Sequence, residues 1–290
     1  MTNAFSRSWE VTKLTFEVIR EDKELILFPI LSGIFSLLFI IAMIFPFVIS
    51  SIAEGITKNS LTSSAMLIVY FIIYLGLAFI ATFFNVCVVY TAKTRFKGKN
   101  ATFGESIKFA FSKLNLILAW SLLAATIGLI LRILDGIAEK SEGIGRWVMK
   151  GIISLLGAAW SIITIFVVPG MVYNNLGPIN AIKKSVQVLK KTWGESLIKY
   201  FALGLTQFLF IIAGIIITII LLILGSGAGI VGIIFAIIVA VLYFVAVITI
   251  FSVANTVFNT ALYVYAETGK VPGKYTKDIM SNAFASRKRK

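Results

Sequence analysis

The chain contains no histidine and only one cysteine, Cys87, which lies in an apolar stretch. A lone cysteine excludes an intramolecular disulfide. The long apolar stretches also contain no aspartate or glutamate. Zinc or iron sites and intramembrane metallo- or aspartyl proteases need ligands or carboxylates that are missing here, and a serine protease would need a histidine base. We therefore expect a protein that is not an enzyme and that has no metal or cofactor.

Charged residues are scarce as well, at 14% of the chain against 59% apolar residues, whereas soluble domains carry about a quarter charged residues. Five stretches have no charge at all: 25–53, 59–92, 114–131, 151–182 and 200–266. Each can cross a bilayer, which takes roughly 20 apolar residues, and the glycines at 225–229 divide the last one. The pattern predicts six spans, at about 25–50, 65–90, 114–133, 150–173, 197–224 and 230–262.

The basic residues are unevenly distributed between the two sides of such a protein. With six spans, both termini share one side, and that side holds 22 of the 27 Lys and Arg residues. Because cytoplasmic loops are enriched in Lys and Arg, we expect a multi-pass plasma-membrane protein with cytoplasmic N and C termini. The net charge of +14 would suggest nucleic acid in a soluble protein. Here topology and attraction to anionic headgroups explain it, so no nucleic-acid partner is expected.

Three short amphipathic helices are predicted on the inner side, one before each pair of spans, at about 6–24, 102–113 and 178–194. The third has the sequence NAIKKSVQVLKKTW, in which Ile182, Val186, Leu189 and Trp193 recur at helical spacing and lysines occupy the other side. Pro178 suits the start of this helix. The second begins with a capping box at 102–105, Thr-Phe-Gly-Glu.

The sequence therefore predicts an all-α polytopic membrane protein in which residues 1–290 form a single integral membrane domain. Its six transmembrane helices form three hairpins, each preceded by a cytoplasmic interfacial helix. The short helices either fix the loops against the bilayer or recognise anionic lipids or an acidic partner. The residues predicted for the second role are Lys108, Lys113, Lys183, Lys184, Lys190, Lys191 and Trp193.

The polar residues within the predicted spans are uncharged. The set of interest is Asn85, Gln207, Asn255, Thr256 and Asn259. Asn255 and Asn259 share a helix face because they are four residues apart. These side chains either hydrogen-bond between helices or line a polar path for an uncharged or lipid-like substrate.

Two further features distinguish the ends of spans. The N-terminal segment is acidic, with Glu10, Glu17, Glu21, Asp22 and Glu24, so it is not suited to lipid headgroups alone. Near the inner end of the fourth span, Pro169-Gly170 is expected to kink or end the helix.

The segments SRSWEVTKLTFEVIREDKELILFPILSGI (Ser6 to Ile34) and ALYVYAETGKVPGKY (Ala261 to Tyr275) resemble the start and end of a family of uncharacterised six-span prokaryotic membrane proteins. The general plan is also similar, more distantly, to the membrane domain fused to some glycerophosphodiester phosphodiesterases. The resemblance implies the fold and the membrane location. It implies no activity or catalytic residues, and this chain lacks the soluble phosphodiesterase domain.

The sequence thus favours a non-enzymatic integral membrane protein that interacts with lipids, or accompanies a membrane complex, through a basic cytoplasmic surface. The expected partners are membrane lipids with anionic headgroups, another membrane protein, or a second copy of the chain. The alternative is a transporter or channel for an uncharged or lipid-like substrate, which would use the path lined by Asn and Thr residues.

Overall fold

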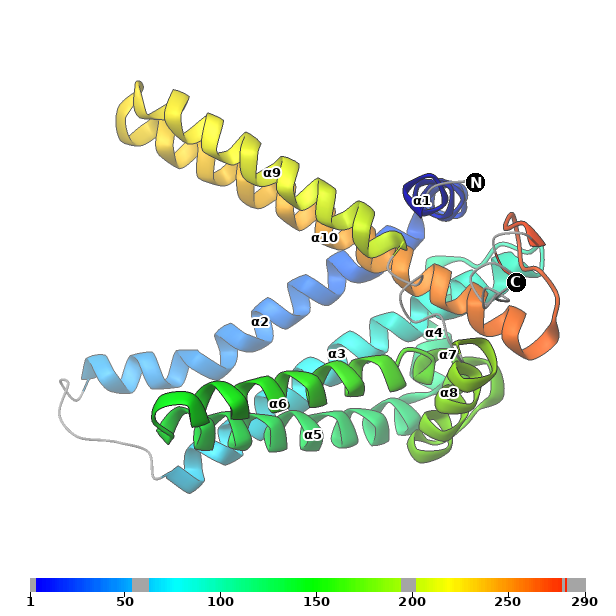
Figure 1. The fold of residues 1–290 in the computed structure, drawn as a ribbon, viewed down its shortest axis with the longest axis horizontal. Helices are drawn as coiled ribbons and strands as arrows, with labels where there is room; N and C mark the ends of the chain where they lie inside the picture. The colour runs from blue at the N-terminus through cyan, green and yellow to red at the C-terminus, as the bar shows by residue number, and fades with distance from the viewer. Residues whose placement is uncertain (1–3, 54–62, 194–201, 278–279, 281–290) are drawn as a thin grey trace. The chain divides into compact units, whose positions relative to one another are not determined.

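A computed structural model describes residues 4–53, 63–193, 202–277 and 280 of the chain, and at 4–8, 47–53, 63–65, 191–193 and 202 it describes the backbone alone. Ten helices and no strand are present among these residues. In chain order they are α1 (Ala4–Glu21), α2 (Glu24–Ala53), α3 (Ser63–Phe96), α4 (Phe103–Ser112), α5 (Leu114–Lys140), α6 (Gly143–Ile163), α7 (Val167–Asn174), α8 (Pro178–Trp193), α9 (Ala202–Ser226) and α10 (Gly229–Thr268) (Figure 1).

Six segments of the described chain are long and apolar enough to cross a membrane: Glu24–Pro46, Met66–Phe96, Leu114–Lys140, Gly143–Asn174, Leu203–Ser226 and Gly229–Thr268. Large apolar side chains are exposed along them, such as Leu38 on α2, Ile216 on α9 and Leu242 on α10. Exposed apolar surface of this extent is unfavourable in water but not against lipid. The structure therefore confirms the predicted class, an all-α membrane protein with six apolar helices.

The helices extend past several of the predicted span ends. The helix that carries the second predicted span continues past residue 90 to Phe96, and the helix that carries the last continues past 262 to Thr268. A helix satisfies its backbone hydrogen bonds whether or not its side chains are apolar, so the end of an apolar run is not the end of a helix. The predicted start of the fifth span, at 197, lies outside the described residues, which resume at Ala202.

The fourth span is broken, because α6 ends at Ile163 and α7 begins at Val167. The sequence placed the disturbance at Pro169-Gly170, which in fact lies inside α7. Proline lacks the N–H that would bond to the carbonyl four residues earlier, and its ring clashes with that carbonyl. For Pro169 that carbonyl belongs to Ile165, so the helix is interrupted one turn before the proline.

The helices divide into two compact units. The terminal unit comprises Met1–Pro29, Ala92–Asn100 and Lys190–Lys290, and the central unit comprises Ile30–Thr91 and Ala101–Leu189. In the terminal unit α9 packs against α10, and α1 contacts both of them. Phe16 of α1 lies against Phe251 of α10, with ring centroids 5.7 Å apart. The N-terminal helix thereby joins the two last spans of the chain.

In the central unit α5 packs against α6, and α2 approaches α3 where the ring of Phe39 lies over Gly76. A side chain at residue 76 would overlap that ring, which explains why a small residue occupies this position. The pairs α2 with α3, α5 with α6 and α9 with α10 each involve consecutive spans. The organisation of the six spans as three hairpins stays a prediction.

The turn between α9 and α10 requires two close-packed glycines. A β-carbon built on Gly225 would lie 2.6 Å from the carbonyl oxygen of Gly232, and one built on Gly232 would lie closer still to the carbonyl of Gly225. Gly229 has a φ of +63°, in the left-handed region that glycine tolerates best. The glycine-rich segment is therefore a tight turn between two spans, as the sequence predicts.

Candidate functional site

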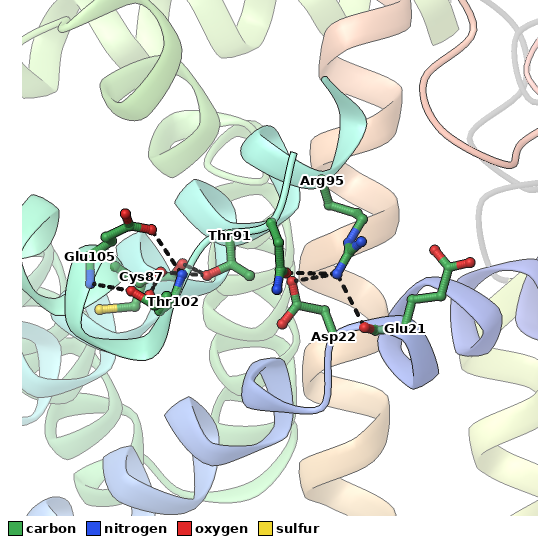
Figure 2. Close-up of polar contacts among 9 residues, drawn as sticks. Glu21, Asp22, Cys87, Thr91, Arg95, Thr102 and Glu105 are labelled. Carbon is green, nitrogen blue, oxygen red and sulfur yellow. Dashed lines mark hydrogen bonds and ion pairs between the residues drawn. The ribbon is translucent and has the colours of Figure 1, made fainter. Parts of the chain in front are cut away.

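The clearest polar cluster of the terminal unit surrounds Arg95, which lies in the last turn of α3. One guanidinium nitrogen, Nη2, lies 3.4 Å from Oδ2 of Asp22 and donates to the backbone carbonyl of Glu21 at 3.1 Å and to Oδ1 of Asn100 at 2.7 Å. Figure 2 shows the Arg95 side chain pointing toward Asp22 and the Glu21 backbone. The Asp22 side chain is only 3% exposed. Arg95 thus holds the junction between α1 and α2.

The pKa values of two carboxyl groups in this cluster shift in opposite directions. Lys274 forms an ion pair with Glu21, and this hydrogen bond lowers the pKa of the exposed Glu21. Burial raises the pKa of Asp22, against the attraction of Arg95. The desolvation of the Asp22 carboxylate therefore outweighs its pairing with the guanidinium.

Two hydroxyl contacts complete the attachment of α1. Thr15 Oγ1 lies 3.0 Å from the hydroxyl of Tyr275, and Thr12 Oγ1 donates to Oγ1 of Thr206 at 3.2 Å. Burial raises the pKa of Tyr275, whose ring also contacts those of Phe96 and Phe258. The two segments that carry the family resemblance, near residues 6–34 and 261–275, therefore contact each other in the terminal unit. The acidic N-terminal segment gains internal basic partners there.

In the central unit, α4 is fixed to the end of α3. Glu105 N–H donates to Thr102 Oγ1 and Thr102 N–H donates to Glu105 Oε2, which confirms the predicted capping box. Ser106, fully buried, lies with its Oγ 2.7 Å from Oγ1 of Thr91, and Thr91 donates to the carbonyl of Cys87 at 3.0 Å (Figure 2). Polar contacts thus hold the short helix against α3.

The helix α8 begins at Pro178. Its buried side chains are Ala181, Ser185, Val188 and Leu189, whereas Ile182 and Val186 of the predicted apolar face are only half-buried. The face of α8 that packs on the protein therefore differs from the predicted apolar face. Ala181 and Ser185 each come one residue before Ile182 and Val186, and it is the first two that are buried. Small residues allow this close contact, and the larger Ile182 and Val186 are left beside it.

The break between α6 and α7 is capped from α8. Ser185 is fully buried, and its Oγ accepts a hydrogen bond from the Phe166 N–H at 3.2 Å. This N–H stands at the start of α7, where a helix has no backbone acceptor of its own to offer. Each short helix thus buries a hydroxyl residue with a partner elsewhere in its unit: Thr15 on α1, Ser106 on α4 and Ser185 on α8.

A second contact holds the other end of α7. Lys113, between α4 and α5, donates from Nζ to Oδ1 of Asn175 at 2.6 Å, and the same ammonium lies 5.4 Å from the ring centroid of Phe109. Asn175 ends α7 in the left-handed conformation, with a φ of 52°. Lys113 therefore has a protein partner, although Asn175 is exposed and Lys113 is only half-buried.

The other predicted lipid-binding residues differ in exposure. Lys108, Lys183 and Lys190 are exposed, and Lys184 is half-buried. The side chains of Lys191 and Trp193 lie outside the described part of the chain.

The predicted polar path divides between the two units. Asn85 belongs to the central unit, and Gln207, Asn255, Thr256 and Asn259 belong to the terminal unit; all five are half-buried. The Oδ1 atoms of Asn85 and Asn259 are buried, and neither has a hydrogen-bond partner among the described residues. The carbonyl of Thr256 accepts from Thr260 Oγ1 at 2.7 Å, a contact within α10.

At the opposite end of the central unit, where α5 joins α6, Arg132, Arg146 and Lys150 have partners, and Lys140 is exposed. Arg132 pairs with Asp135 at 3.3 Å and lies over the ring of Tyr70. Arg146 donates to the carbonyls of Ser141 and Glu139 and so satisfies the end of α5. Within the described residues, no group of three or more histidine, cysteine or carboxylate side chains could hold a metal ion.

A comparison with models of protein families identifies the family of this chain. The family described as "Family of unknown function (DUF6159)" matches residues 63–273. The chain belongs to this family. The match runs from the start of α3 to the segment after α10, so it includes five of the six apolar helices of this chain. A comparison with curated proteins gives no match.

Membership in DUF6159 confirms the resemblance to an uncharacterised membrane protein family. The more distant similarity to the membrane domain of glycerophosphodiester phosphodiesterases gains no support from these comparisons. It stays an expectation from the general plan of the sequence.

Proposed function

We propose that this DUF6159 protein is a non-enzymatic membrane protein that binds anionic lipid headgroups through its short helices, at the cytoplasmic face of the plasma membrane. The observation that carries the proposal is the contrast between the two ends of the central unit. At one end Lys108 and Lys183 are exposed and Lys113 contacts Asn175; at the other Arg132, Arg146 and Lys150 have partners and Lys140 is exposed. Exposed lysines beside apolar surface attract anionic headgroups at about 1 kcal/mol each.

The geometry of α8 supports the same function. Ser185 and Ala181 fix one face to the protein, Ile179 is 54% exposed, and Lys183 and Lys190 lie at the surface two turns apart. A helix held in this way can place an apolar side chain in the interface while its lysines reach headgroups. The same surface would fit an acidic protein partner, which the test below separates from lipid.

The test compares binding of lipids to the purified protein in mild detergent by native mass spectrometry. We expect wild type to retain phosphatidylglycerol in preference to phosphatidylcholine, and Lys183→Gln/Lys190→Gln to weaken that preference by about 30-fold, which corresponds to roughly 2 kcal/mol for two lysines. The matched control is Lys140→Gln/Lys150→Gln, which removes two charges where α5 joins α6. An equal loss in both variants, or retention of a co-purifying protein instead of lipid, would contradict the proposal.

A second function has one observation in its favour, the buried Oδ1 atoms of Asn85 and Asn259 that lack partners among the described residues. Leaving a buried amide oxygen unpaired costs about 1–3 kcal/mol. A function that uses the group accounts for that cost, and a polar path for an uncharged solute is such a function.

Transport would be measured as solute-specific leakage from liposomes that contain the protein. If Asn259 lines a path, Asn259→Leu should abolish leakage of an uncharged polar solute, and the neighbouring Ser252→Ala, which changes an exposed side chain, should not. Absence of leakage with wild-type protein would rule out this function and would leave lipid binding untouched.

A further inference from the structure

The short helix α7 is buried and held at both ends by side chains from other parts of the central unit. All residues from Val167 to Val172 are buried. At its start, Ser185 of α8 accepts the N–H of Phe166. At its end, Lys113 donates to the side chain of Asn175. Two hydrogen bonds, both from segments next to the exposed lysines, therefore fix a helix whose connection to α6 is already broken.

The two attachments differ in accessibility. Ser185 and Phe166 are both fully buried, so no headgroup can replace that contact. Asn175 is exposed and Lys113 is half-buried, so a ligand from the interface can reach the Lys113 ammonium. Asn175 also holds the left-handed conformation, which costs most residues roughly 1–2 kcal/mol and is favoured for asparagine only by its local hydrogen bonds.

We propose that the phosphate of an anionic lipid takes the Lys113 ammonium from Asn175 and so loosens the end of α7. This inference rests on the proposed lipid binding and adds its site and its consequence. A phosphate oxygen carries negative charge and so attracts the ammonium by Coulomb interaction as well as by the hydrogen bond, whereas Asn175 offers only a neutral amide oxygen. The ammonium moves from one acceptor to the other, while Ser185 keeps the start of α7 in place.

Hydrogen exchange of α7 in nanodiscs measures the consequence. In wild type, replacing phosphatidylcholine by a mixture with phosphatidylglycerol should speed exchange of the amides from Gly170 to Asn174 by about tenfold, the factor that corresponds to losing one hydrogen bond of about 1.4 kcal/mol. The Phe166 amide should not change, because its acceptor is on α8. An unchanged rate from Gly170 to Asn174 would overturn the inference.

Two variants isolate the contact. Lys113→Met keeps an unbranched side chain of nearly the same length but removes its donors, and Asn175→Gly removes the acceptor while suiting the positive φ. In both, exchange of α7 should be fast in either lipid. The control Lys108→Met removes an exposed lysine from α4 and should respond to lipid as wild type does. If Lys113→Met does not fold, Asn175→Gly carries the test alone; a lipid response that persists in it contradicts the proposal.

Two further measurements distinguish a lipid phosphate from a free phosphate, and the release of α7 from the proposed lipid binding. Inorganic phosphate added to phosphatidylcholine nanodiscs should leave the exchange rate unchanged; acceleration would show that a free anion, not a lipid, is the ligand. Native mass spectrometry of the same samples counts bound phosphatidylglycerol. Lipid bound without faster exchange overturns the release of α7 and leaves the proposed function standing, whereas no bound lipid overturns both.

Discussion

At the scale of single residues, the pair Asp22 and Arg95 illustrates how pairing and burial compete. Asp22 is almost completely buried while Arg95 keeps a side-chain exposure of 23%, and burial raises the pKa of Asp22 despite the guanidinium beside it. The carboxylate therefore gains less from Arg95 than it loses by leaving water. The two members of the pair should not be equally important for stability.

We expect Arg95→Gln to destabilise the protein by about 2 kcal/mol, less than the 3–5 kcal/mol of a fully buried pair because Arg95 is partly exposed. The variant leaves the buried Asp22 carboxylate without its cation. Asp22→Asn should be much milder, since the amide oxygen still accepts from Arg95. Thermal unfolding in detergent measures both, and the double variant should be more stable than Arg95→Gln alone. A double variant that is less stable would show that the carboxylate itself is stabilising.

The pH dependence of the same pair has a defined sign. Because the pKa of Asp22 is raised in the folded protein from its ordinary value of 3.8, the folded state holds the proton more tightly than the unfolded chain. The stabilisation that the protonated Asp22 contributes is complete below its ordinary pKa and is lost as the pH rises through its pKa in the folded protein. The melting temperature of Asp22→Asn should therefore gain on wild type as pH rises from 4 toward 7. Glu21 and Glu24 are present in both proteins and cancel; a difference that narrows with rising pH contradicts the assignment.

At the scale of helices, the turn between α9 and α10 depends on the absence of side chains at two positions. We expect Gly232→Ala to destabilise the protein by about 1–3 kcal/mol, because its β-carbon would overlap the Gly225 carbonyl and force the helices apart. Gly151→Ala on α6 is the matched control: its β-carbon would meet open space, and alanine favours a helix by up to about 1 kcal/mol. Unfolding curves with equal shifts for the two variants would contradict this account.

The helices also show which features the sequence could predict. Runs without charge predict the six spans because a charge is costly in the bilayer centre, and the capping box is local enough to be recognised from residues 102–105. The sequence placed the break at Pro169-Gly170, whereas the structure has it at 164–166. The difference arises because proline acts on the carbonyl four residues before it. On α8, apolarity could not select the protein-facing side, since lipid and protein interior are equally apolar and the small residues Ala181 and Ser185 made the contact.

The candidate sites depended on pairings that leave no local pattern. Arg95 and Asp22 are 73 positions apart, and Lys113 and Asn175 are 62 apart. The sequence recognised an acidic N-terminal segment and a set of lysines, but charge alone does not specify which acid meets which base. Lys113 was consequently predicted with the other lysines to bind anionic lipid or a partner, although its ammonium contacts Asn175 in the structure.

At the scale of the whole molecule, the distribution of basic residues determines the orientation expected in the membrane. The described basic residues where α5 joins α6, other than the exposed Lys140, have carboxylate, carbonyl or aromatic partners, which lowers the cost of placing them on the outer side. Lys108 and Lys183 are exposed and would face anionic lipid on the inner side. Six spans then put Lys99 and Lys183 together on the inside, and Glu142 on the outside.

Single cysteines at these three exposed positions test both the orientation and the number of spans. The native Cys87 is fully buried, so wild-type protein serves as the unlabelled control. In intact cells a membrane-impermeant maleimide should label Glu142→Cys and should reach Lys99→Cys and Lys183→Cys only after permeabilisation. The reverse pattern would invert the orientation and place the basic short helices at the outer surface. Two crossings between residues 99 and 183, one by α5 and one by the broken pair α6 and α7, return the chain to the side from which it left. Labelling of Lys99→Cys and Lys183→Cys from opposite sides would therefore mean that these helices do not each cross the membrane once.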